Sequence, residues 1–260
     1  MCAIAGIINF SENMLMREGM HALAVREMGE VMAHRGPDAD GEWVGEHAAF
    51  AHRRLAVIDP LRGAQPMKRT VEGHEFVICY NGELYNAPEL RSELSARGYR
   101  FETACDTEVL LYAYIHYGEG CAEHLNGIYA FAVWDSMRQS VFLCRDRFGV
   151  KPLFYSICGD EVIFASEIKA LLVHPYVKAE VDSEGLCELF ALSPARTQGV
   201  GVFRGVCELE AAHSMTVSRR GVKKMRYWQL ESREHRENYA ETAEHVRALL
   251  CDAIRRQLVS

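Results

Sequence analysis

Up to about Val173 the chain alternates short runs of β-type residues with a few helical segments. Gly, Pro, Asn and Asp bound these runs, which is typical of strands separated by turns. Several runs form hairpin-like pairs, and this favours antiparallel pairing over the βαβ order of a nucleotide-binding sheet. We therefore predict an α+β domain. The expected strands are residues 3–8, 51–58, 75–80, 128–134, 141–144, 153–157 and 162–165.

Two helix starts can be placed in this part of the chain. Asn86 is followed three residues later by Glu89, with Pro88 in the first turn, which predicts a capping box and a helix to about Arg97. Asp106, with Glu108 just after it, predicts a second helix leading into residues 109–117.

The composition changes near the C-terminal end. From Tyr239 the apolar residues recur at helical spacing, which predicts one apolar helical stripe. The segment 231–238 before this helix is highly charged. We expect residues 1–228 to form one domain and residues 229–260 to be a charged linker and the first helix of a further C-terminal domain. The stripe consists of Val246, Leu249, Leu250, Ala253, Ile254 and Leu258.

Charge and hydropathy exclude several classes of protein. The 260 residues, 49% of them apolar, can bury a real core, and the net charge of −7 offers no basic stripe for nucleic acid or an anionic membrane. The longest apolar runs, such as 128–134, are far shorter than the ~20 residues of a membrane-spanning helix. No basic segment precedes the apolar N-terminal residues, so we expect no secretory signal and a cytoplasmic protein.

Cysteine and histidine spacing argues against a metal site. The nine cysteines are an odd number without Cys-x-x-Cys spacing, so a disulfide framework or redox pair is disfavoured. Cys79, Cys144, Cys158 and Cys251 lie in apolar stretches and are expected to be buried. The eleven histidines lack ligand spacing, and we predict no metal.

Cys2 directly follows the initiator Met1. Excision of Met1 would leave a thiol and a free α-amino group on one residue. A thiol titrates near about 8.5 and an α-amino group near about 7.7 to 8.0, so nucleophile and base come together at cell pH. Such a residue can attack an amide without a histidine. The alternative is that Cys2 only starts a buried strand.

Two polar clusters are candidate parts of a site. His34-Arg35-Gly36-Pro37-Asp38 indicates a tight turn that presents polar side chains, and a surface turn with a local ion pair is the alternative. In the segment 80–86, Asn81-Gly82 after a strand is usually a hairpin turn. Alternatively, the Asn81 amide and the Gly82 N–H could donate to an oxyanion, with Glu83 holding a substrate ammonium.

Together these stretches resemble the class II glutamine amidotransferases, whose N-terminal cysteine hydrolyses glutamine, and within them the asparagine synthetase branch. Seven stretches in this order are not a chance agreement. The resemblance implies a four-layer αββα sandwich of two antiparallel sheets, the N-terminal nucleophile hydrolase fold. The stretches are residues 1–7, 34–38, 51–59 with 63–66, 80–86, 106–108, 145–155 (RDRFGVKPLFY) and 165–171 (ASEIKAL).

The resemblance also implies residue roles. Cys2 is the nucleophile and its own amine is the base, acting through a water, while Asn81 and the Gly82 N–H form the oxyanion hole. Glu83 and Asp106 hold the α-amino group of glutamine, although a helix-cap role for Asp106 stays open. Arg54, and not Arg53, grips the glutamine carboxylate, within a substrate-binding segment that comprises Arg54, Leu55, Ala56, Val57 and Ile58. The stretch 34–38 shapes the wall near Cys2, and Lys151-Pro152 and Ser166-Glu167 are expected in scaffold or domain contacts.

The implied reaction converts L-glutamine and water into L-glutamate and ammonia through a thioester on Cys2. The glutaminase domain needs no cofactor. ATP and Mg²⁺ are expected only in a C-terminal synthetase domain beyond residue 260, where ammonia would be used to make asparagine from aspartate. A related amidotransferase with another ammonia acceptor and a catalytically silent regulatory module are the alternatives. Oligomeric state is left open, with a homodimer among the states allowed.

Overall fold

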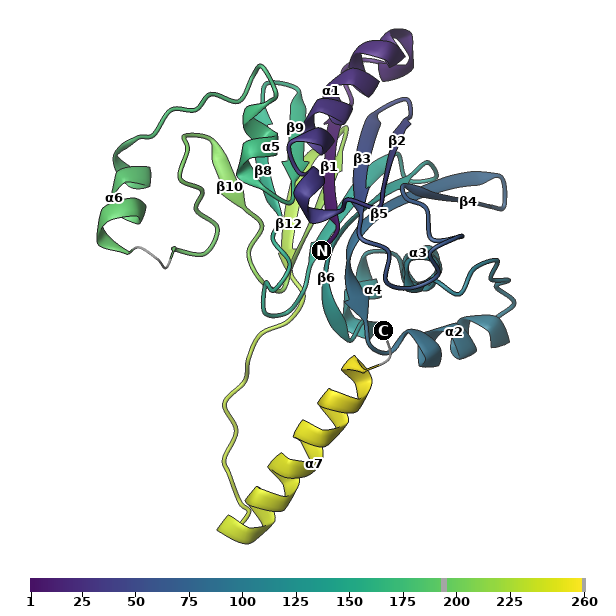
Figure 1. Cartoon of the computed structure of the whole chain (residues 1–260), viewed down its shortest axis with the longest axis vertical. Helices are drawn as coiled ribbons and strands as arrows, with labels where there is room; N and C mark the ends of the chain where they lie inside the picture. The colour runs from purple at the N-terminus through teal and green to yellow at the C-terminus, as the bar shows by residue number, and fades with distance from the viewer. Residues whose placement is uncertain (193–195, 259–260) are drawn as a thin grey trace.

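The computed structural model describes residues 1–192 and 196–258 and shows two six-stranded antiparallel sheets packed face to face (Figure 1). In the first sheet the strand order is β10-β8-β9-β1-β3-β2, and in the second it is β12-β11-β7-β6-β5-β4. The first sheet contains β1 (Ala3–Asn9), β2 (Ala39–Val44), β3 (Ala48–Arg54), β8 (Phe154–Cys158), β9 (Glu161–Ala165) and β10 (Val206–Glu208). The second contains β4 (Met67–Val71), β5 (His74–Leu84), β6 (Gly127–Asp135), β7 (Ser140–Arg145), β11 (His213–Ser218) and β12 (Gly221–Arg226).

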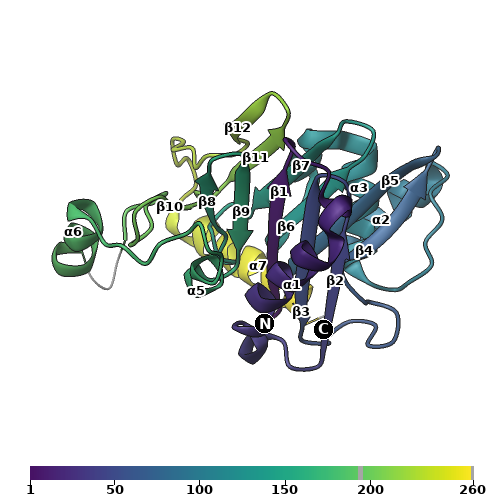
Figure 2. The same ribbon diagram turned by 90° about the horizontal axis from the view of Figure 1, so that it is seen from above.

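Helices cover the outer faces of both sheets (Figures 1 and 2). On the first sheet lie α1 (Glu18–Glu30) and α5 (Ile168–Leu172), which also contact each other. On the second, α3 (Asp106–Tyr117) packs on β5, and α2 (Ala87–Ala96) and α4 (Cys121–His124) pack against α3. The predicted four-layer αββα sandwich is therefore confirmed. Short 3₁₀ turns occur at Met14–Arg17, Ala33–Arg35 and Gly118–Gly120.

Side-chain alternation along β1 shows why its sequence is continuously apolar. Ile4 and Ile8 face the second sheet, whereas Ala3 and Ile7 face the helices of the outer layer. Because successive side chains of a strand point to opposite faces, a strand buried on both faces needs apolar residues throughout.

The strand predicted for residues 51–58 is wrong at its C-terminal half, because β3 ends at Arg54 and residues 55–58 form a loop. The Asn81-Gly82 pair is not a hairpin turn either. Both residues lie inside β5, which pairs with β6 as far as Leu84. The sequence did not predict several elements that lack a clear apolar period, among them α1, β2 and the solvent-exposed edge strand β12.

The predicted capping box at Asn86 is wrong, although α2 begins at the next residue. The Asn86 side chain donates to the His124 carbonyl at 2.9 Å and accepts from the Asn126 N–H at 2.9 Å. It therefore joins the start of α2 to the loop before β6. Among the cysteines, Cys79 and Cys144 are buried as predicted, but Cys158 is half-buried and Cys251 is exposed.

The helix predicted from Tyr239 is confirmed as α7 (Tyr239–Gln257), and it extends away from the sheets (Figure 1). A capping box of Asn238 and Glu241 begins it. Its apolar stripe is largely exposed, and Arg256 near its end pairs with Glu89 of α2 at 3.0 Å. That α7 opens a second domain stays a prediction. The helices of residues 1–192 and 196–258 include none long and apolar enough to cross a membrane. The remaining helix, α6 (Ser183–Ala191), projects beyond the β10 edge of the first sheet (Figure 2).

Candidate active site

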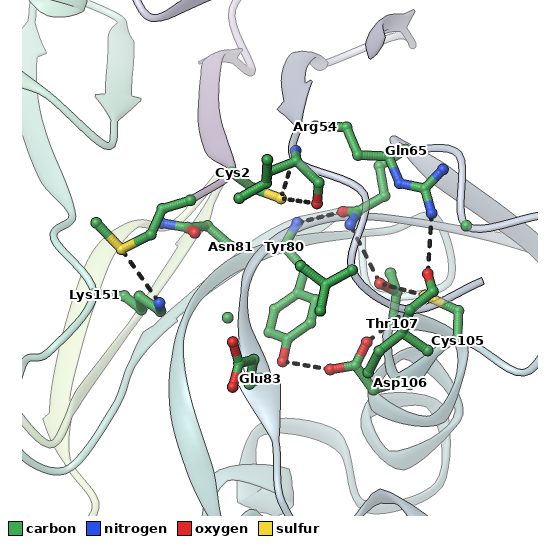
Figure 3. Close-up of a pocket in the computed structure, with 16 residues that line it drawn as sticks. Cys2, Arg54, Gln65, Tyr80, Asn81, Glu83, Cys105, Asp106, Thr107 and Lys151 are labelled. Carbon is green, nitrogen blue, oxygen red and sulfur yellow. Dashed lines mark hydrogen bonds between the residues drawn. The ribbon is translucent and has the colours of Figure 1, made fainter. Parts of the chain in front are cut away.

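A pocket lies where the start of β1 meets the C-terminal ends of β3 and β5 (Figure 3). It brings together the predicted site residues, apart from Ala56, whose backbone N–H instead donates to Asp38 at 2.8 Å. The predicted residues that line it are Cys2, Arg54, Leu55, Val57, Ile58, Asn81, Gly82, Glu83 and Asp106.

The Cys2 sulfur contacts the first residue after β3. Leu55 N–H donates to Sγ at 3.4 Å, and the Leu55 carbonyl lies 3.6 Å from Sγ. Burial raises the pKa of the Cys2 thiol, while the Leu55 N–H and the positive charges of the N-terminus, Arg54 and Lys151 oppose this rise. Formation of a thiolate near neutral pH would therefore require a base.

Two of the matching stretches support the start of β1. Arg35 donates to the Cys2 carbonyl at 3.1 Å and forms an ion pair with Glu167 at 3.0 Å. The Ser166 hydroxyl accepts from Ile4 N–H at 3.0 Å. Residues 34–38 and 165–171 thus fix the backbone around Cys2.

Asn81 lines the same pocket as Cys2 because of its position in β5. Val77 and Cys79 lie in the core between the sheets, so Asn81, at the same alternation, also faces the first sheet. Within the described residues its Nδ2 is a buried donor without a hydrogen-bond partner. A buried unpaired amide is costly, which indicates a partner absent from the free protein.

The Gly82 N–H lies on an unpaired edge of the sheet. On this edge Tyr80 N–H donates to Gln65 Oε1 at 2.7 Å and Leu84 N–H to Asp106 Oδ2 at 3.1 Å. The N–H of Gly82, between these two residues, points to the same edge. Gly82 lies beyond Ile78, the last residue of β5 that pairs with β4. A Cβ at Gly82 would lie 2.4 Å from the Ile128 carbonyl, so this position needs glycine.

The side chain of Arg54 folds the loop that follows it. Its guanidinium donates to the carbonyls of Ile58, Asp59 and Pro60 at 3.1, 2.7 and 2.8 Å. A Cβ at Gly63 would lie 2.3 Å from this guanidinium. Arg53 points to the other face of β3 and pairs with Asp40 at 3.6 Å. The pocket therefore receives Arg54 and not Arg53.

Asp106 is a buried carboxylate at the first residue of α3, where the helix dipole favours negative charge. Its Oδ2 accepts from the Tyr80 hydroxyl at 2.9 Å as well as from Leu84. Burial raises the pKa of Asp106, and these hydrogen bonds act in the opposite direction. Because Cys105 is the N-cap residue of α3, Asp106 does not serve as the helix cap.

Comparison with known proteins assigns the chain to a family. A family profile of the glutamine amidotransferase domain matches residues 1–228. The chain belongs to this family. It is 47% identical to glutamine-hydrolysing asparagine synthetase 3 of Bacillus subtilis over all of this chain and 42% of the relative. Asparagine synthetase 1 of the same organism is 42% identical over 72% of this chain and 29% of the relative.

The chain thus spans less than half the length of these curated relatives. Among solved structures, the glutamine phosphoribosylpyrophosphate amidotransferase of B. subtilis aligns with a TM-score of 0.64. The alignment covers 90% of this chain and 50% of that chain at 20% identity, which supports the fold.

In this amidotransferase domain Lys151, which was expected in a scaffold or domain contact, also lines the pocket. Gln65 and Thr107 also belong to the wall, joined by a hydrogen bond of 3.2 Å. Gln65 and Thr107 each lie in a stretch that carries the family resemblance. The spacing of residues in the sequence does not predict that their side chains point into the pocket. No group of three or more His, Cys, Asp and Glu residues within 1–192 and 196–258 could hold a metal ion.

Proposed function

We propose that this domain hydrolyses L-glutamine to L-glutamate and ammonia through a γ-glutamyl thioester on Cys2. The observation that carries the proposal is the unpartnered, buried Nδ2 of Asn81, which lines the same pocket as the Cys2 thiol. With the Gly82 N–H it supplies two donors where the oxyanion of an attacked amide would develop.

After excision of Met1, the neutral α-amine of Cys2 accepts the thiol proton and the thiolate attacks the γ-carboxamide carbon of glutamine. Asn81 Nδ2 and Gly82 N–H stabilise the oxyanion. The ammonium of Cys2 then returns the proton to the leaving nitrogen, and ammonia departs as the thioester forms. A water, deprotonated by the same amine, attacks the thioester and releases glutamate and the free thiol.

The remaining pocket residues account for the choice of substrate. Glu83 and Asp106 present two carboxylates to the α-ammonium of glutamine, and Arg54 presents a cation to its carboxylate. The three residues together favour glutamine, which has a free α-ammonium and a free α-carboxylate, over an amide that lacks these two charges. The free thiols of the chain are consistent with a reducing compartment, and we place the domain in the cytoplasm.

We further propose that the ammonia serves a C-terminal synthetase domain that uses ATP and Mg²⁺ to convert aspartate to asparagine. The similarity to asparagine synthetases along the whole chain supports this acceptor. Residues 1–260 alone, given aspartate, ATP and Mg²⁺, should form no asparagine. Asparagine synthesis by residues 1–260 would contradict the assignment of the synthetase activity to a further C-terminal domain.

The glutaminase activity is tested with the processed domain and its Cys2→Ser variant. The wild-type domain should release ammonia and glutamate in equal amounts. Acid quenching during turnover should trap an N-terminal peptide heavier by one glutamyl group. The serine variant should bind glutamine without measurable ammonia release. A processed wild-type domain that binds glutamine but never hydrolyses it would favour the silent regulatory module instead.

A further inference from the structure

Lys151 lies in a turn whose backbone is held rigidly. The Asp146 carboxylate accepts from the backbone N–H groups of Phe148, Val150 and Lys151, each at 3.0 Å. The Arg145 guanidinium donates to the Lys151 and Gly149 carbonyls, each at 2.8 Å. The position from which the Lys151 side chain enters the pocket is therefore fixed by five hydrogen bonds.

The ammonium of Lys151 has no anionic partner among the described residues. Its side chain is buried, with 6% of the residue exposed, and within the described residues the hydrogen bond of Nζ goes to the Met1 sulfur, at 3.4 Å (Figure 3). A thioether is a weak acceptor, and a buried cation without a counter-charge is costly. Excision of Met1 removes even this contact and leaves the ammonium in the same pocket as Cys2.

Two other charged groups that line the pocket are held in place by hydrogen bonds to the protein. The Arg54 guanidinium is bound by three loop carbonyls, and Asp106 accepts from Tyr80 and Leu84. Behind Cys2, Arg35 pairs with Glu167. The titratable groups that face the pocket besides Lys151 are Cys2, Tyr80, Glu83, Cys105 and Asp106.

We infer that Lys151 is a positioning residue for the proposed glutamine hydrolysis, whose ammonium favours the deprotonated thiol and the neutral α-amine of processed Cys2. The inference rests on the proposed function. A nearby cation stabilises a thiolate and disfavours a second cation, so both effects make Cys2 more reactive near neutral pH. The charge of Lys151 already lowers the pKa of the Cys2 thiol against the effect of burial. The thiol proton still moves to the α-amine, and Lys151 takes no part in the proton transfer.

The test uses Lys151→Met, which keeps an unbranched side chain, one atom shorter, and removes its charge. Lys151→Arg restores the charge, and Lys178→Met, at an exposed lysine paired with Glu180 at 3.9 Å, is the matched control. Each protein is released from a cleavable leader so that Cys2 is the first residue, as verified by intact mass. The rate of Cys2 alkylation by iodoacetamide is followed on the N-terminal peptide as a function of pH, which requires no glutamine turnover.

In Lys151→Met the midpoint of the alkylation profile should rise by about one pH unit. The acid limb of kcat/KM should shift in the same direction, and kcat/KM near neutral pH should fall ~10-fold, with KM for glutamine within a few fold. Lys151→Arg should recover most of both shifts, and Lys178→Met should match the wild type. If Lys151→Met folds poorly, Lys151→Gln provides the same comparison.

Unchanged alkylation and kcat/KM profiles in both uncharged variants would overturn the inference while the glutaminase function stands. A large rise in KM with unchanged pH profiles would also overturn it, because Lys151 would then contact the substrate directly. If the wild type releases no ammonia but the alkylation shift is present, the proposed function fails and the effect of Lys151 on Cys2 stands.

Discussion

The Tyr80 hydroxyl donates a hydrogen bond of 2.9 Å to Oδ2 of Asp106 beneath the glutamine pocket. Burial raises the pKa of the Asp106 carboxyl, and this bond is the first of the interactions that oppose the rise. Tyr80 thereby helps to keep Asp106 ionised, which is the form that can attract the substrate ammonium.

Tyr80→Phe should therefore raise the pKa of Asp106 further. As pH falls, Asp106 will become neutral sooner in the variant than in the wild type, so KM for glutamine will begin to rise at a higher pH. Well above neutral pH the two enzymes should agree in KM. Measurement of KM from about pH 5 to about pH 8 checks this. Profiles that superimpose over the whole range would show that Asp106 does not depend on Tyr80 for its charge.

Asn81→Ala should lower kcat by ~100 to 1,000-fold, because one of two oxyanion donors is lost. KM should change little, since the bond strengthens in the transition state. Asn13→Ala, at an exposed asparagine that caps a short 3₁₀ turn, is the matched control and should retain kcat. A kcat for Asn81→Ala within a few fold of the wild type would mean that another donor stabilises the oxyanion.

Arg54→Ala should raise KM for glutamine by about 10 to 100-fold, because a charge-assisted bond to the substrate carboxylate is lost. Arg53→Ala should have a much smaller effect, since Arg53 pairs with Asp40 away from the pocket. Arg54→Lys should restore little, because an ammonium cannot reproduce the bonds to three loop carbonyls. Equal effects of the two alanine substitutions would show that the pocket does not distinguish these arginines.

The sequence predicted those parts of the fold whose signal is local. β1 and β9 are apolar on both faces, and α3 begins at its acidic pair, so composition and spacing were sufficient. The end of β3 was not predictable in this way. Leu55, Val57 and Ile58 are good strand residues, and the contacts of Arg54 with carbonyls four to six residues later bend them into a loop.

At Asn81-Gly82 the local sequence signal indicates a turn, whereas the structure has a strand. The pair is a strong local turn signal, but pairing with Ala130 and Tyr129 of β6 overrides it. The residue types, a side-chain amide beside a glycine N–H, indicated the chemical alternative at this pair, and the resemblance to a family favoured it over the turn. Lys151 was missed because its place in the pocket depends on the hydrogen-bonded turn at Asp146, which spacing does not reveal.

His52, buried between the sheets, should make stability depend on pH. Burial lowers its pKa to about 4 from an ordinary value of 6.5, with Arg54 adding to the decrease and the bond to the Tyr80 carbonyl opposing it. Below about pH 6.5 the unfolded chain binds a proton at His52 that the folded chain does not. The free energy of unfolding should therefore decrease as the pH is lowered from about 6.5 to about 4, by up to ~1.4 kcal/mol per pH unit.

Urea unfolding of the wild type and of His52→Gln at several pH values isolates this contribution. The glutamine variant can still donate to the Tyr80 carbonyl but has no titrating group. Its free energy of unfolding should therefore decline less steeply over the same window. Equal slopes for the two proteins would mean that His52 is protonated in the folded state.

Catalysis should require removal of Met1, which lines the pocket and contacts Lys151 through its sulfur. With Met1 in place the Cys2 nitrogen is an amide without a basic lone pair, and the extra residue fills space beside the thiol. Excision frees an amine with a pKa of about 7.7 to 8.0 next to the nucleophile. Glutaminase activity should therefore scale with the fraction of chains that have lost one methionine, measured by intact mass.

A chain that carries an uncleavable N-terminal extension provides the sharpest form of this test. Its thiol is the same, but it lacks the free amine, so it should release almost no ammonia at any pH. The same chain with a cleavable extension should gain activity in step with cleavage, which excludes damage to the fold. Full activity from chains proven to retain Met1 would overturn the N-terminal nucleophile mechanism, because some other group would then have to deprotonate Cys2.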